Sequence, residues 1–116
     1  MKQGREYSVY LEDILDAVQK TMDFIGEMSF DQFARDDKTI FAVIRALEII
    51  GEASKNIPEQ IKKDNTEIPW REMAGIRDKL IHDYFGIDLD VIWKTVKEDL
   101  PPLAPIITHI LGLESS

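Results

Sequence analysis

The chain has 116 residues, of which 44% are hydrophobic, and this is enough for one domain, residues 1–116, with a single core. Lys and Arg number 14 against 22 Asp and Glu, and the formal net charge of -8 disfavours a protein that coats nucleic acid by general attraction. The absence of cysteine excludes disulfides and thiolate zinc sites. No apolar run is long enough for a membrane span, and the N-terminal sequence does not read as a signal peptide. We therefore expect a cytoplasmic protein.

The first part of the chain carries apolar residues at three- and four-residue spacing with charged residues between them. This pattern predicts an amphipathic helix from Ser8 to about Met28, with Ser8 as its N-cap. Residues 29–35 should follow as a turn or a single helical turn.

A second long helix, capped by Asp36 or Asp37, is predicted to run to about Asn56. Gly51 lies inside it at a cost of about 1 kcal/mol relative to alanine, which close approach of another helix would explain. One face of this helix is polar and consists of Arg45, Glu48 and Glu52. That face is either a solvated surface with internal ion pairs or a polar patch that meets the Arg77 region or a second subunit.

Four further helical segments are predicted, over residues 58–63, 69–86, 88–100 and 103–111. Pro69 suits the first position of its helix because it lacks only an N–H that has no helical partner there, and Gly86 suits the end. Asp88 is the expected cap of the next helix. Since no alternating strand pattern occurs, the expected fold is all-α: an antiparallel four-helix-type bundle with short extra helices.

Arg77, His82 and Tyr84 form the string R-x-x-x-x-H-x-Y within one predicted helix. The apolar arc of that helix comprises Trp70, Met73, Ala74, Ile76, Leu80, Ile81 and Tyr84. Arg77 falls within this arc, where a guanidinium is costly unless it finds a partner. His82 lies about one turn beyond Asp78, whose carboxylate can fix the tautomer of the imidazole.

Several catalytic chemistries do not fit this sequence. The two histidines, His82 and His109, are too few and too far apart for a zinc site, so no metal is expected. The glycines are scattered singly rather than gathered in a phosphate-binding loop, and no serine stands in a nucleophile-elbow sequence. No cofactor is therefore expected.

Metal-free cleavage of a phosphodiester needs fewer specialised residues than these chemistries do. An imidazole can take a proton from a ribose 2′-hydroxyl or give one to the leaving oxygen, while a guanidinium stabilises charge on the phosphoryl oxygens. His82 and Arg77 supply these groups. The residue types alone equally allow an Arg77 that pairs with a carboxylate of the bundle, a His82 that interacts with the helix C-terminus and a Tyr84 that belongs to the core.

The segment from Arg77 to Tyr84 resembles the R-x4-H-x-Y signature of HepT toxins, which belong to the HEPN superfamily of helical ribonucleases. Asp78 fits the polar residue that usually follows the arginine. The resemblance extends to Ala46-Leu47-Glu48-Ile49-Ile50-Gly51-Glu52-Ala53, Pro69-Trp70, Met73-Ala74-Gly75-Ile76-Arg77 and Leu100-Pro101-Pro102-Leu103. It implies a HEPN-like fold and a metal-independent endoribonuclease in which Arg77 and His82 are catalytic and Asp78 supports them.

The resemblance further implies the toxin of a toxin-antitoxin pair, which acts on RNA as a homodimer. Its two motifs would meet across a shared cleft, and no DNA or membrane partner is expected. The implied antitoxin is an MNT-type nucleotidyltransferase that transfers AMP from ATP to Tyr84. The competing hypothesis is a non-catalytic helical module of the same fold that acts through nucleotide or partner contacts.

Overall fold

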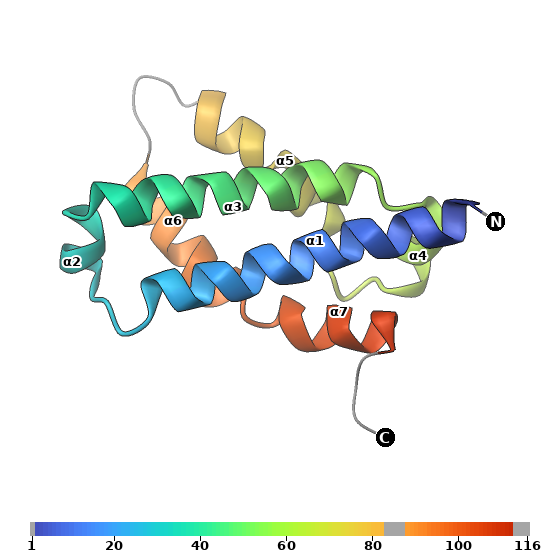
Figure 1. Ribbon diagram of the computed structural model, residues 1–116. Coiled ribbons are helices and arrows are strands. Elements are labelled where there is room, and N and C mark those ends of the chain that lie inside the picture. Colours follow the sequence, from blue (N-terminus) through green and yellow to red (C-terminus); the bar gives the residue numbers. More distant parts are fainter. Residues whose placement is uncertain (1, 83–87, 113–116) are drawn as a thin grey trace.

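The structure is a computed structural model that describes residues 2–82 and 88–112; for residues 2–6, 77 and 79–82 it describes the backbone alone. Every element in these ranges is a helix, which confirms the all-α, HEPN-like prediction (Figure 1). The longer helices are α1 (Lys2–Ile25), α3 (Asp37–Lys55), α5 (Trp70–His82) and α7 (Leu103–Leu111). The shorter ones are α2 (Phe30–Ala34), α4 (Glu59–Asp64), α6 (Leu89–Lys94) and the π-helix η1 (Thr95–Asp99).

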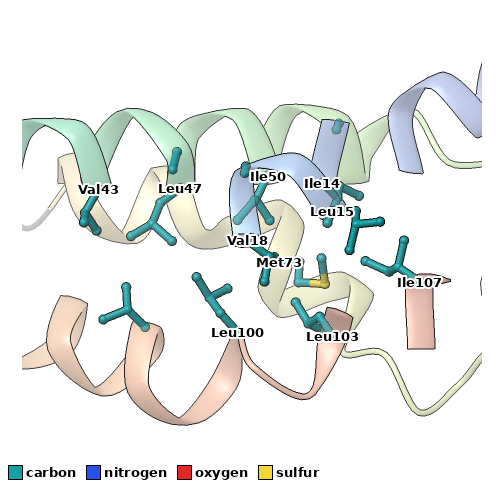
Figure 2. Packing of buried hydrophobic residues seen from close by; sticks show 14 of the residues in the cluster. Ile14, Leu15, Val18, Val43, Leu47, Ile50, Met73, Leu100, Leu103 and Ile107 are labelled. Atoms are coloured by element: carbon teal, nitrogen blue, oxygen red, sulfur yellow. The ribbon is translucent and has the colours of Figure 1, made fainter. Parts of the chain in front are cut away.

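The two longest helices, α1 and α3, lie side by side and run in opposite directions (Figure 1). Helix α5 packs against α3, and α7 packs against α1. Apolar side chains from all four meet in one core, to which α6 and η1 also contribute. Figure 2 shows part of this core, with Met73 of α5 between Ile50 of α3 and Leu103 of α7.

Helix α1 begins and ends earlier than its apolar pattern predicts. Its backbone is already helical at Lys2, so Ser8 lies inside the helix and the prediction that it is the N-cap is wrong. The residues before Ser8 include several good helix formers, which extend the helix although they carry no apolar periodicity. At the other end, Gly26 adopts φ +49 and stops the helix at Ile25 rather than near Met28.

The predicted connection over residues 29–35 forms the short helix α2. Ser29 accepts a hydrogen bond from the Gln32 backbone N–H, and the Gln32 side chain accepts one from the Ser29 N–H, which is a complete capping box. The next helix, α3, is capped by Asp36, one of the two residues predicted for this role, which accepts from the Thr39 N–H at 3.0 Å. Hydrogen bonds from side chains to backbone N–H groups therefore fix the starts of α2 and α3 near the predicted positions.

The predicted helix over residues 88–100 is present, with Asp88 accepting from the backbone N–H groups of Asp90 and Val91. Its second half departs from α-helical geometry. The Leu100 N–H donates to the Thr95 carbonyl at 3.0 Å, five residues back, so that this part is the π-helix η1. The Pro101-Pro102 pair follows, and α7 occupies the predicted residues 103–111.

Candidate functional site

The start of the motif helix α5 is anchored by buried groups. Ile68 and Trp70 are buried, and the Trp70 indole N–H donates to the Asn65 carbonyl at 3.0 Å. The Pro69 carbonyl accepts the first helical hydrogen bond, from the Met73 N–H at 3.0 Å. The helix therefore begins at Trp70, one residue after the predicted start at Pro69.

Gly51 of α3 sits directly against α5. A Cβ atom at this position would lie 3.2 Å from Cγ2 of Ile76 and 3.3 Å from the carbonyl oxygen of Met73. This contact confirms the predicted close approach of another helix at Gly51, and only glycine allows it without movement. It fixes α5 at Met73 and Ile76, and Ile76 immediately precedes Arg77.

The described part of the motif consists of the α5 backbone and the exposed side chain of Asp78. Arg77 and His82 both lie on α5, five residues apart, so their Cα positions are about 140° apart around the helix axis. The side chains of these two residues lie outside the described part of the chain, as do Tyr84 and the helix end predicted at Gly86. Of the predicted apolar arc, Trp70 and Met73 are buried.

The polar face of α3 lines a hollow of about 170 Å³ together with side chains of α1. Arg45 forms an ion pair with Glu48 at 3.6 Å, as an exposed helix face with internal pairs would. Tyr10 and Asp13 of α1 complete the hollow. Sequence reasoning missed these two residues because only the packing of α1 on α3 brings them to Arg45.

A second, adjoining hollow of about 260 Å³ continues along the same two helices and shares Arg45 and Ile49 with the first. Phe24 lines it and is 42% exposed, and Phe41, one residue before the lining residue Ala42, is 70% exposed. We call the surface formed by the two hollows and Phe41 the α1–α3 face. It carries the most exposed large aromatic residue of the described chain.

Among the side chains that the structure describes, no three or more His, Cys, Asp or Glu residues are grouped closely enough to hold a metal ion. No helix in the described part is both long and apolar enough to cross a membrane.

The fold and the motif together define an all-α bundle with an arginine and a histidine on one helix that is held against its neighbour. The family model "Ribonuclease HepT-like" matches residues 14–110. The chain therefore belongs to the HepT-like ribonuclease family of HEPN type.

Curated relatives agree with this assignment. The chain is 62% identical over 99 residues to a protein of Thermococcus cleftensis named "Probable ribonuclease HepT", covering 85% of this chain and 90% of that protein. It is 46% identical over 112 residues to a protein of Methanocaldococcus jannaschii named as a candidate RNase, with 93% of each chain covered. A candidate RNase of Caldanaerobacter subterraneus subsp. tengcongensis is 41% identical over 105 residues, covering 90% of this chain and 94% of the relative. No solved structure matches the chain.

Proposed function

We propose that this protein is a metal-independent endoribonuclease whose catalytic residues are Arg77 and His82. The observation that carries the proposal is membership of the HepT-like ribonuclease family together with an intact R-x4-H-x-Y string in the sequence, whose Arg77 and His82 lie on α5. The packing of Gly51 against Met73 and Ile76 supports it, because a catalytic pair needs a rigid element behind it.

In the proposed reaction, the His82 imidazole takes the proton from a ribose 2′-hydroxyl. The 2′-oxygen attacks the phosphorus, the bond to the 5′-oxygen breaks, and the leaving 5′-oxygen takes a proton from the imidazolium, which returns the histidine to its neutral form. The Arg77 guanidinium stabilises the negative charge that builds on the phosphoryl oxygens. The exposed carboxylate of Asp78 supports the pair by orienting the imidazole. The products are a 2′,3′-cyclic phosphate and a 5′-hydroxyl.

The active form is proposed to be a two-fold homodimer. Residues about 140° apart on one helix converge poorly within a single chain, whereas two copies can supply both residue types to one cleft. The α1–α3 face suits such contact, since Phe24 and Phe41 are exposed there and α3 is also the helix against which α5 packs. The final helix and Gly51 suit it less, because Leu103, Ile107 and Gly51 are buried within the chain.

Toxin activity and its control are proposed from the family resemblance. An MNT-type nucleotidyltransferase would attach AMP to Tyr84, which adds a phosphodiester anion for Arg77 to bind in place of the RNA phosphate. Peptide mapping of the chain co-expressed with an MNT-type nucleotidyltransferase should find adenylylation that disappears in Tyr84→Phe. An unmodified Tyr84 in a neutralised toxin would mean that the partner acts by masking the cleft.

The competing function is a non-catalytic module that binds protein partners. One observation favours it: the net charge of -8 opposes association with an RNA polyanion. The same charge argues equally against a nucleotide-binding role. Our conclusion remains that the protein cleaves RNA at a local cationic site, because the motif supplies the arginine and the histidine that the reaction needs.

The deciding experiment is cleavage of a fluorescent RNA by the purified full chain. Arg77→Ala and His82→Ala should each lower the rate by about 10²–10³-fold, the usual loss when a charge-stabilising group is removed. The matched controls are Arg71→Ala, an exposed arginine on the same helix, and His109→Ala on α7. Equal losses in the motif and control variants at unchanged helix content, or no cleavage by the wild type, would contradict the catalytic proposal.

A further inference from the structure

A cavity of about 360 Å³ opens beside the first half of α5, on the side of the core that faces η1 and α7. Its walls are largely apolar and include Ile50, Met73, Leu100 and Leu103, all four of which are labelled in Figure 2. This volume falls within the range of about 300–1,000 Å³ that is typical of small-molecule sites. A site of this kind is mostly apolar with a few polar groups that converge, so the polar lining decides which ligand fits.

The polar lining comes from two helices. Glu72 projects from α5, while Thr95 and Asp99 belong to the π-helix η1. Thr95 and Asp99 are four residues apart on η1, and both line the cavity. The Thr95 hydroxyl donates its proton to the Val91 carbonyl at 2.9 Å, which leaves its oxygen as an acceptor. π-turns of this kind occur frequently at functional sites.

All three polar side chains therefore present acceptors, and two of them are carboxylates. The described lining contains no lysine, arginine or histidine, and no described side chain forms an ion pair with Glu72 or Asp99. An anionic ligand would be repelled both here and by the net charge of -8. A ligand with ammonium groups and an apolar body matches both the rim and the walls.

We propose that this cavity binds a small aliphatic diamine. Its stem lies against the apolar walls, and its two ammonium groups bind the carboxylates of Glu72 and Asp99. Two separate carboxylates, one on α5 and one on η1, favour a diamine over a monoamine. The bound diamine bridges these two helices. The proposal does not depend on the catalytic one, because diamine binding can be measured whether or not the chain cleaves RNA.

Isothermal titration calorimetry on the full chain at low ionic strength tests this proposal without RNA. The probe is 1,5-diaminopentane, and the comparison ligands are 1-pentylamine, 1-pentanol and pentanedioate, which share the five-carbon stem. We expect the diamine to bind most tightly, the monoamine more weakly, and pentanedioate not at all. An excess of Mg²⁺ at matched ionic strength should leave most of the diamine binding intact, because a hydrated metal ion has no stem to bury.

The site is assigned with carboxamide variants. Glu72 and Asp99 are both exposed, so Glu72→Gln and Asp99→Asn should each weaken diamine binding about fivefold, the upper range for an exposed ion pair. Glu98→Gln is the matched control, since this exposed residue lies on the same π-helix but does not line the cavity. The proposal is overturned if no heat is measured up to about 10 mM diamine, if pentanol or Mg²⁺ substitutes fully, or if Glu98→Gln weakens binding as much as Asp99→Asn. Circular dichroism of each variant separates lost binding from lost folding.

Discussion

Replacing Gly51 with alanine tests the contact that holds the motif helix in place. The new methyl group would lie 3.2 Å from Cγ2 of Ile76 and 3.3 Å from the Met73 carbonyl oxygen. The side chain of Ile76 can rotate, whereas the carbonyl is backbone and moves only if α5 moves with it. Overpacking of this kind costs about 1–3 kcal/mol, while alanine in a helix interior gains about 1 kcal/mol over glycine. We therefore expect Gly51→Ala to lower the free energy of unfolding by about 1 kcal/mol.

Gly75→Ala is the matched control for this experiment. Gly75 lies inside α5, and a Cβ atom at this position would meet nothing within 4 Å. The variant should therefore gain stability, by up to about 1 kcal/mol from helix propensity alone. Urea unfolding followed by circular dichroism measures both changes at an unchanged m-value. If Gly51→Ala stabilised the chain as much as Gly75→Ala does, the close packing of α3 on α5 would be wrong.

Three other predictions follow from the site and the fold. RNA cleavage should proceed equally well in EDTA and leave 2′,3′-cyclic phosphate ends, and inhibition by the chelator would refute the metal-free mechanism. Phe41→Asp should shift sedimentation towards monomer while the exposed Lys38→Asp does so less, and a wild type that is monomeric at micromolar concentration would contradict the dimer. The Thr39 backbone N–H lowers the pKa of Asp36 below its ordinary 3.8, so this carboxylate stabilises the fold above that pH and loses its effect as the pH falls through the lower folded-state pKa. Asp36→Asn keeps the cap but should remove this part of the acid-induced loss of stability, as acid unfolding monitored by circular dichroism will show.

Much of the helical framework could be predicted from the sequence because its signals are local. Asp36 and Asp88 both cap the helices that the sequence assigns to them, and α7 has its predicted bounds. The fold class follows from the same periodicity, and the R-x4-H-x-Y string marked α5 as the motif helix before its packing was known. Local signals fail where a stretch has no apolar pattern, as at the start of α1, where Ser8 proved to be inside the helix.

Only the tertiary structure decided which residues from different helices meet. The place of Tyr10 beside Arg45 depends on the register of α1 against α3, and no pattern within either helix encodes that register. The cavity beside α5 likewise depends on tertiary packing, because its lining comes from α3, α5, η1 and α7 and no pattern within one helix encodes how the four meet. Gly51 lies between these two cases. The sequence indicated that close approach of another helix would explain a glycine in a helix interior, and the packing decided that this helix is α5.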